Sequence, residues 1–353
     1  MLNKLVNDSN YHDVVRFLVQ DNRMDQRGCN LQNIPSKGNG ELVRRCFVPE
    51  PGWVFVGADL SQIEPRIQAH IMYERYGDNS LRQIFLDNVD LYTTMAMRTF
   101  GFEEKYCVDK AYSPDGTFQP RKLMKQGVLA VSYQQTPKAF AKTMGVSEEV
   151  AQDFFRNFDE QFPSFKTMVK DIVDKMKKTG YSETLFGRKR RFPKYKYYQK
   201  LIQQNEPKLK ELYKKRKKLL EIKNPTPLQK KQFKQIQEQI KELRKPYALA
   251  AANEREAFNN VIQGTGADII KQNGNRMYKV CREKGWRMVA SIHDEIIITM
   301  PQKDVTPENI QLVNDVMTKT VTLSVPLKSD TVIMTRWMDE HSPEEWFAKF
   351  GQG

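Results

Sequence analysis

Two aspartates, Asp59 and Asp294, each border short apolar runs of the length expected of a buried strand. Residues 54–58 read Val-Phe-Val-Gly-Ala before Asp59, and Asp294 lies inside a His-Asp-Glu triplet between two further apolar runs. Such runs predict strands in the middle of a sheet, where charged groups are costly unless they serve a purpose. Carboxylates and substrate phosphates together hold Mg²⁺, so these two aspartates are candidate ligands of a metal site.

The residues after Asp59 predict the start of a helix. Ser61 and Glu64 have the spacing of a capping box, and Pro65 falls in the first turn, where its missing N–H does no harm. An isolated Asp at such a strand-to-helix corner is equally compatible with an ordinary helix cap. Other motifs of the chain are needed to distinguish a metal ligand from a helix cap at Asp59.

A second candidate element is the segment that follows Pro120. Its residues Arg121, Lys125, Leu129 and Tyr133 recur at every fourth position, which places them on one face of a predicted helix. Two cations followed by an apolar and an aromatic side chain could hold a triphosphate and support a base, although an amphipathic surface helix has the same pattern. A glycine inside a helix costs about 1 kcal/mol, so the glycine of this segment predicts a mobile element.

Two polar segments offer hydrogen-bond donors without a large net charge. They contain Arg23, Asn30 and Gln32 of the loop 22–35 and Arg255, Asn259 and Gln263 of a predicted helix. Side chains of these types reach minor-groove acceptors and sugar–phosphate oxygens of a duplex. The loop is also compatible with a solvated turn.

Length and composition bound the class of protein. A chain of 353 residues predicts two or three lobes. Its four cysteines form no C-x-x-C pair, which disfavours a disulfide framework and a zinc finger. The absence of a secretory signal and of a long apolar run predicts a cytoplasmic protein.

The positive charge is concentrated in one segment. The net charge is +14, yet residues 194–245 alone hold 17 Lys and Arg against 5 Glu, so the rest of the chain is almost neutral. Apolar residues with 3-4-3 spacing predict two antiparallel helices here, joined near residues 224–227. Contact with nucleic acid, binding of a protein partner and simple solvation remain open for this hairpin.

Six motifs, in family order, resemble the family A DNA polymerases, the group of bacterial DNA polymerase I. Asp59-Leu-Ser-Gln-Ile-Glu64-Pro-Arg66 is similar to motif A, Arg121-x3-Lys125-x7-Tyr133 to motif B, and His293-Asp294-Glu295 to motif C. Residues 30–35, 180–188 and 263–268 match further family signatures. Pro65 in motif A resembles phage-encoded members, which implies a host cytoplasm as the location.

The resemblance implies an α+β fold, that of a right-hand polymerase with an antiparallel-sheet palm and helical fingers. The expected domains are palm 1–70, fingers 71–195, an inserted basic helical hairpin 196–250, and palm 251–353. The implied activity is that of a DNA-directed DNA polymerase, which adds dNTPs to a primer 3′-OH on a DNA template. The implied cofactor is two Mg²⁺ ions, for which Mn²⁺ can substitute. A non-catalytic DNA-binding or assembly subunit that kept the fold is the alternative.

The resemblance also assigns roles to residues. The catalytic set is Asp59, Asp294, Lys125 and Glu295, and the metal ligands are Asp59, Asp294 and the Leu60 carbonyl. The nucleotide-binding set is Arg121, Lys125, Leu129, Tyr133, Glu64, Gln62, Ile63 and Tyr92, with Glu64 as the gate against a ribose 2′-OH. The DNA-binding set is Arg23, Asn30, Gln32, Arg66, Arg255, Asn259, Gln263 and His293.

The chain departs from the family pattern at several positions. Leu129 stands where the family usually has Phe or Tyr, Ala130 where it has Gly, and Tyr92 where many members have a phosphate-binding His. These departures bear on sugar discrimination and nucleotide affinity. Only about 20 residues precede the Arg23 loop, from which we expect half of a split or truncated polymerase. A second protein chain would then supply the thumb and exonuclease functions.

Overall fold

The computed structural model describes residues 34–132 and 135–351. These residues form two compact units, which we call the sheet unit and the helical unit. The sheet unit ends at Asn88 and resumes at Thr265, and the helical unit is Val89–Gly264. The assignment of palm and fingers to particular boundaries stays a prediction. Among the described residues, no helix has both the length and the apolar composition needed to cross a bilayer.

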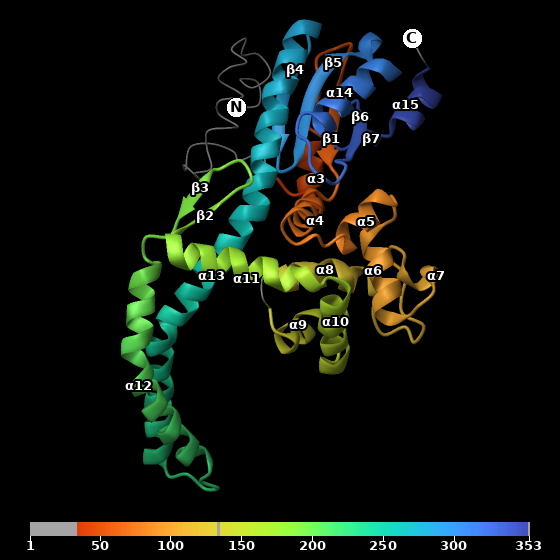
Figure 1. The fold of residues 1–353 in the computed structure, drawn as a ribbon. Coiled ribbons are helices and arrows are strands. Elements are labelled where there is room, and N and C mark those ends of the chain that lie inside the picture. The colour runs from red at the N-terminus through yellow and green to blue at the C-terminus, as the bar shows by residue number, and fades with distance from the viewer. Residues whose placement is uncertain (1–33, 133–134, 352–353) are drawn as a thin grey trace. The chain divides into compact units, whose positions relative to one another are not determined.

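The sheet unit is built on one antiparallel sheet of five strands in the order β4-β5-β1-β6-β7 (Figure 1). The strands are β1 (Trp53–Leu60), β4 (Arg287–Ile292), β5 (Glu295–Pro301), β6 (Ser329–Met334) and β7 (Glu340–His341). The predicted strand before Asp59 is therefore the central strand β1, and the two runs around Asp294 are β4 and β5. The prediction of an α+β fold with an antiparallel sheet is confirmed.

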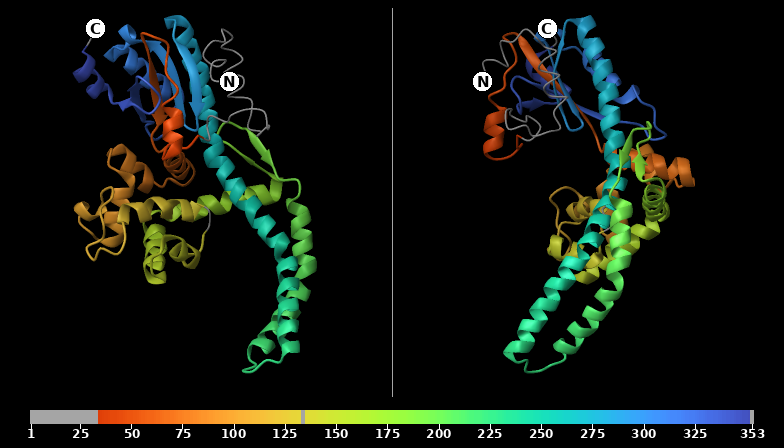
Figure 2. Two further views of the ribbon diagram at one scale, coloured as in Figure 1. Left: turned by 180° about the vertical axis from the view of Figure 1, so that it is seen from behind. Right: turned by 90° about the vertical axis from the view of Figure 1, so that its left-hand side faces the viewer.

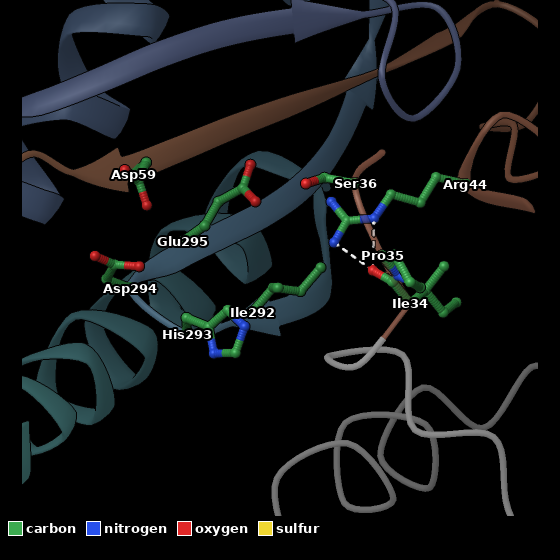
Figure 3. A pocket seen from close by; sticks show the side chains of 9 residues that line it. All are labelled: Ile34, Pro35, Ser36, Arg44, Asp59, Ile292, His293, Asp294 and Glu295. Atoms are coloured by element: carbon green, nitrogen blue, oxygen red, sulfur yellow. Dashed lines mark hydrogen bonds between the residues drawn. The ribbon is translucent and has the colours of Figure 1, made fainter. Parts of the chain in front are cut away.

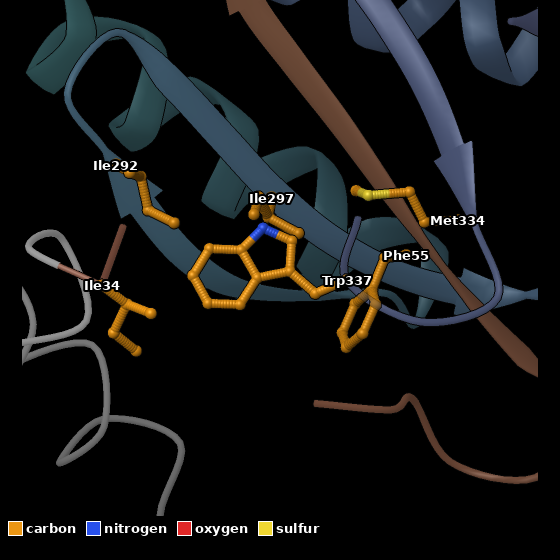
Figure 4. Close-up of a cluster of buried hydrophobic side chains, with 6 residues drawn as sticks. All are labelled: Ile34, Phe55, Ile292, Ile297, Met334 and Trp337. Carbon is orange, nitrogen blue, oxygen red and sulfur yellow. The ribbon is translucent and has the colours of Figure 1, made fainter. Parts of the chain in front are cut away.

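Strand β1 is buried because both of its faces carry apolar side chains. Val54, Val56 and Ala58 alternate with Phe55 along the strand, and all four are buried. On the Phe55 face, a cluster forms around Trp337 (Figure 4); its buried members are Ile34, Phe55, Ile292, Ile297, Met334 and Trp337. Two of its members, Ile34 and Ile292, also line the pocket that contains the candidate acidic residues.

Helices complete the sheet unit. They are α3 (Asn39–Arg44), α4 (Ile63–Tyr76), α5 (Ser80–Leu86), α14 (Pro307–Lys319), α15 (Pro343–Phe350) and the C-terminal part of α13 (Pro227–Lys284). A 3₁₀ turn, η2 (Gln302–Asp304), follows β5. Helix α4 begins at Ile63, and its N-cap Gln62 has φ 53° and makes no side-chain cap bond. The predicted capping box of Ser61 and Glu64 is wrong, because the chain turns through a left-handed residue instead.

The helical unit contains one small hairpin of strands and a set of helices. The helices are α6 (Leu91–Phe100), α7 (Glu104–Cys107), α8 (Pro120–Ser132), α9 (Pro137–Met144), α10 (Glu148–Gln161), α11 (Pro163–Thr179), α12 (Tyr195–Leu220) and the N-terminal part of α13. The strands are β2 (Tyr181–Glu183) and β3 (Lys189–Arg191), which pair across the predicted turn at Gly187.

Helix α8 packs tightly on α10 through Gly127. A Cβ atom at this position would collide with the Phe154 ring, and Phe154 itself stacks among Phe140, Phe155 and Phe158. The glycine thus allows close approach of two helices. The presence of glycine at residue 127 therefore does not require a mobile helix, because this packing offsets the lost helix propensity.

Helices α12 and the first part of α13 form the predicted antiparallel hairpin (Figure 2). Its apolar seam consists of the buried residues Leu209, Leu212 and Ile240, with Ile236 and Leu243 packed against them. The second helix does not stop at the predicted domain boundary 250/251. Helix α13 continues without interruption to Lys284 and includes Pro246.

Candidate functional site

The end of β1 places Asp59 opposite acidic residues of both neighbouring strands. In the sheet register, Asp59 pairs with Glu295 on β5 and with Asp330 on β6. Side chains of directly paired residues lie on the same face of a sheet, so three carboxylates stand in one row across three strands. Like charges in this arrangement repel each other, which a protein tolerates where the charge has a use.

The turn between β4 and β5 adds Asp294 to this row. His293 and Asp294 form the two-residue connection, and His293 is exposed with φ 55°, a left-handed conformation that is uncommon outside glycine. The Leu60 N–H donates to the Asp294 carbonyl at 3.1 Å, which ties the turn to the end of β1. The tight turn therefore delivers Asp294 to Asp59 from a segment more than 200 residues away in the sequence.

Asp59, Asp294 and Glu295 line a pocket of about 490 Å³ (Figure 3). Its lining residues are Ile34, Pro35, Ser36, Arg44, Asp59, Ile292, His293, Asp294 and Glu295. Arg44 does not neutralise the acidic residues by a direct salt bridge within the described structure. Its guanidinium instead donates to the Ile34 carbonyl at 2.7 and 3.1 Å and lies over the Trp337 ring.

Two carboxyl groups of the pocket have raised pKa values, because they are buried close to other carboxylates. Burial raises the pKa of Asp59 to about 6, helped by the charge of Asp294, a hydrogen bond with its side chain, and the charges of Asp330 and Glu340. Burial also raises the pKa of Glu295 to about 7, helped by Asp59, while the Arg44 cation acts in the opposite direction. The pocket thus holds more negative charge than its own cations compensate.

The strand β1 leaves room for Glu295 because residue 57 is glycine. A Cβ atom at Gly57 would lie 2.5 Å from Oε1 of Glu295 and 3.1 Å from Cε of Met334. No real Cβ–oxygen contact is that short, so any side chain at residue 57 would displace the Glu295 carboxylate. Gly57 therefore determines where this carboxylate lies, a role that the strand pattern alone did not reveal.

The donor set fits a divalent cation. Asp59 and Asp294 supply hard oxygen ligands in one pocket. Burial and then the charge of Asp294 raise the pKa of Asp59, and a bound cation would oppose both effects. Among the described residues, no group of three His, Cys, Asp or Glu side chains has the geometry of a complete metal cage. Two carboxylates without a cage suit Mg²⁺, which usually keeps waters and substrate phosphates as further ligands. The Leu60 carbonyl as a third ligand stays a prediction.

The cationic helix predicted from Arg121 and Lys125 is α8 of the helical unit. Arg121 forms a bidentate pair with Asp90 at 3.0 and 3.1 Å and a second pair with Asp109 at 3.4 Å. The pair with Asp90 raises the pKa of Arg121, and it also lowers the pKa of Asp90 against the effect of that carboxyl's burial. The guanidinium lies 5.8 Å from the Tyr92 ring centroid. Arg121 and Tyr92, both predicted to bind nucleotide, thus meet in this unit.

Asp90 and Asp109 were missed in the sequence. Asp90 caps helix α6 by accepting from the Thr93 N–H at 2.7 Å, and the same carboxylate orients Arg121. Its position two residues before Tyr92, at the N-cap of helix α6, was the available signal. Lys125 is exposed one turn after Arg121, and Leu129 is half-buried.

Three further predicted site residues, Ile63, Glu64 and Arg66, lie in the first turns of α4 and are buried or half-buried. Ile63 is buried, and Glu64 is half-buried in the first turn of α4. Arg66 is also buried: its Nε donates to the Ser61 carbonyl at 2.8 Å and its Nη1 to the Pro326 carbonyl at 2.5 Å. This arrangement gives Arg66 a structural role, and its contact with DNA stays a prediction.

The predicted row on helix α13 is present within the helical unit. Arg255 and Gln263 are exposed and Asn259 is half-buried. The next residue, Asn260, is buried and donates to the Ser182 hydroxyl at 3.0 Å, which anchors α13 to β2. Arg23, Asn30, Gln32 and Tyr133 lie outside the described residues.

The structure thus combines carboxylates at strand ends in the sheet unit with cations on helix α8 of the helical unit. The chain matches the DNA polymerase family A over residues 11–339, and it belongs to this family. The resemblance seen in the sequence is thereby confirmed; the likeness to phage-encoded members stays a prediction.

Two curated relatives show the extent of the match. The chain is 31% identical over 325 residues to DNA polymerase I of Chloroflexus aurantiacus, covering 91% of the chain and 28% of the relative. It is 27% identical over 317 residues to the thermostable DNA polymerase I of Thermus aquaticus, covering 90% of the chain and 31% of the relative. The chain thus spans less than a third of the length of these relatives.

A solved structure is similar in fold. It is the POL domain of Pol1 from M. smegmatis in complex with DNA primer-template and dNTP, with a TM-score of 0.63 and 26% identity. The match covers 88% of this chain and 45% of that chain.

Proposed function

We propose that this chain is a DNA-directed DNA polymerase that extends a primer 3′-OH with dNTPs by two-Mg²⁺ nucleotidyl transfer. The observation that carries the proposal is the meeting of Asp59, Asp294 and Glu295 in one pocket at the end of the central strand. Membership of the family A polymerases supports the same activity. The dNTP and the primer-template are named in the similar solved complex, and both are proposed here as ligands of this chain.

In this proposal Asp59 and Asp294 hold the metal ions. The bound ions supply activation of the primer hydroxyl and stabilisation of charge on the transferred phosphate. The repulsion between the Asp59 and Asp294 side chains favours binding of a cation in the pocket. Glu295 lies behind them, over Gly57, and increases the negative potential of the pocket.

The helical unit contributes the phosphate-binding cations. Arg121 is preorganised by Asp90 and Asp109, which fix the fork of its guanidinium before a triphosphate arrives. Lys125 is exposed and available as a point charge for the same phosphates. Tyr92 lies beside Arg121 in place of the family's frequent His, and it offers a phenol rather than an imidazole to the phosphates.

The remaining assignments complete the proposal. Glu64 gates the ribose 2′-OH, with Gln62, Ile63 and Leu129 beside the incoming nucleotide. His293, Arg255, Asn259 and Gln263 contact the DNA. The need for a second protein chain remains a separate prediction, which size-exclusion chromatography and a processivity assay of the purified chain would test.

Replacement of Asp294 by Asn tests the function. We expect Mg²⁺-dependent incorporation of dNTPs to fall on the order of 10³-fold, because an amide removes a ligand charge that is used in the transition state. Binding of primer-template DNA should remain largely intact. Glu308→Gln is the matched control, since it removes one carboxylate at the exposed start of α14, outside the pocket. Unchanged incorporation by the Asp294 variant would favour the alternative, a non-catalytic DNA-binding subunit.

A further inference from the structure

Helix α12 carries a row of lysines on the face opposite the apolar seam of its hairpin. Leu209 and Leu212 are buried against Ile240 and define the inward face of α12. With 3.6 residues per turn, the opposite face consists of positions about half a turn away from these leucines. The lysines on this face, which we call the α12 lysine row, are Lys196, Lys200, Lys210, Lys214, Lys217 and Lys218.

The α12 lysine row is exposed and poorly neutralised. All six side chains are exposed, and within the described part of the chain only Lys210 forms a salt bridge, with Glu206 at 2.8 Å. Glu211 is exposed on the same face as the row, and its carboxylate pairs at 2.6 Å with Lys215, which lies off the row. Five cations therefore face solvent together without a carboxylate partner, whereas a helix designed only for solubility interleaves both signs.

The dimensions of the row match a duplex. From Lys196 to Lys218 the row covers 22 helical steps, which at 1.5 Å per residue is about 33 Å. This length is close to one turn of B-DNA, about 34 Å. A duplex presents one negative charge per about 1.7 Å of its axis, so phosphates are available both to Lys196 and Lys200 at one end of the row and to the row's four lysines from Lys210 to Lys218 at the other.

The composition of the row favours a phosphate backbone over a protein partner. Cores of protein interfaces are enriched in aromatic residues and depleted in lysine. The exposed apolar residues of α12, Tyr197 and Leu220, lie to the sides of the row. Binding of single strands normally uses aromatic side chains that stack on bases, and the row contains none. The charge pattern thus fits sequence-independent contact with double-stranded DNA.

We propose that the α12 lysine row is a second DNA-binding surface, separate from the acidic pocket, that holds the phosphate backbone of duplex DNA. This inference rests on the proposed function, because it takes the DNA of the polymerase reaction as the ligand. The family motifs do not include residues 196–250, and the α12 lysine row assigns DNA binding to this segment.

The test is a salt titration of duplex binding by the full chain. Fluorescence anisotropy with a labelled duplex of about 30 base pairs gives the slope of log Kobs against log salt concentration. The triple variant Lys214→Gln, Lys217→Gln, Lys218→Gln should reduce the magnitude of this slope by about 2 to 3 and weaken binding about tenfold or more at 0.1 M salt. Gln has nearly the helix propensity of Lys, so α12 should stay folded, which circular dichroism would verify.

A matched control separates the row from net charge. Lys231, Lys234 and Lys241 are exposed on α13 of the same hairpin, and their triple replacement by Gln removes the same charge. We expect this control to leave the salt slope within about 0.5 of the unmodified chain. Equal losses in the two triple variants would overturn the proposal, because the effect would then be one of overall charge. An unchanged slope in the α12 variant would overturn it as well.

Turnover distinguishes failure of this inference from failure of the proposed function. At saturating primer-template, the α12 triple variant should incorporate dNTPs at the rate of the unmodified chain, because its pocket is unaltered. Asp294→Asn should show the converse, with lost turnover and an unchanged salt slope. Turnover that persists in Asp294→Asn contradicts the proposed function, whereas a normal salt slope in the triple variant contradicts only the role of the lysine row.

Discussion

The acidic pocket and the basic hairpin both concentrate charge of one sign, yet they do so under opposite physical conditions. In the pocket, carboxylates are packed at the end of a buried strand, and their pKa values rise because neither water nor cations compensate them. On the hairpin, lysines lie on exposed helix faces, and two of those on α12, Lys210 and Lys215, pair with a Glu one turn away. Charge that is held against its own repulsion marks a chemical site, whereas exposed charge on a helix costs little to maintain and acts through its arrangement along one face.

The stability of the hairpin should depend on its apolar seam far more than on its charged side chains. Leu212→Ala removes a side chain that is only 5% exposed, so we expect a loss of about 2 to 4 kcal/mol in the free energy of unfolding of this element. Hydrogen exchange of the α12 and α13 amides would measure the loss. A loss below about 0.5 kcal/mol would mean that the seam does not hold the two helices together.

The pocket should make stability depend on pH in the absence of divalent cations. The pKa of Glu295 is about 7, above its ordinary value of 4.5, so the folded state keeps a proton that the unfolded chain has lost. The free energy of unfolding should therefore fall as pH rises from about 4.5 to 7. We expect a contribution of about 2 kcal/mol after allowance for screening.

Chemical denaturation in EDTA across this pH range measures that contribution. Glu295→Gln should flatten the fall relative to the unmodified chain, and Glu308→Gln should leave it unchanged because Glu308 is fully exposed. Identical pH profiles for the unmodified chain and Glu295→Gln would show that the pocket is not strained by its charge.

Gly57→Ala should alter the pocket without unfolding the sheet. The new Cβ meets the flexible ends of Glu295 and Met334 most closely and Cγ2 of Val332 at 3.3 Å, so we expect the first two side chains to move while the backbone stays in place. We expect turnover to fall about tenfold, while the unfolding midpoint stays within a few degrees. In the Glu295→Gln background the same substitution should cause no additional loss, since Gly57 acts through Glu295. Independent, multiplying losses would refute this linkage.

The smallest effect is expected on the exposed face of the hairpin. Glu211→Gln breaks a pair with Lys215 in which both side chains are exposed, and exposed pairs of this type contribute little. The thermal unfolding midpoint should not change measurably. A clear decrease, comparable with that of the adjacent Leu212→Ala, would erase the contrast between the two regions.

The sequence predicted those features that depend on local pattern. Alternating or continuous apolar runs located β1, β4 and β5. Recurrence at i+4 located α8, and the 3-4-3 spacing of apolar residues located the hairpin seam. The family motifs also brought Asp59 and Asp294 into one candidate site, and the pocket contains both.

Features that depend on long-range register could not be predicted. Asp330 and Glu340 act on Asp59 only because β6 and β7 pair beside β1, and no local pattern specifies that register. The ion pairs of Arg121 with Asp90 and Asp109 join residues 31 and 12 positions apart. The capping box failed because Gln62 takes a left-handed conformation, a choice that the sequence motif did not indicate.

The most direct test of the account is a double-mutant cycle of Asp59→Asn and Asp294→Asn in Mg²⁺-dependent primer extension. If the two carboxylates hold the same metal centre, each single substitution lowers turnover on the order of 10³-fold and the double variant is no slower than the slower single variant. Turnover near that of the unmodified chain in either single variant would contradict the account. Losses that multiply in the double variant would likewise show that Asp59 and Asp294 act as separate sites.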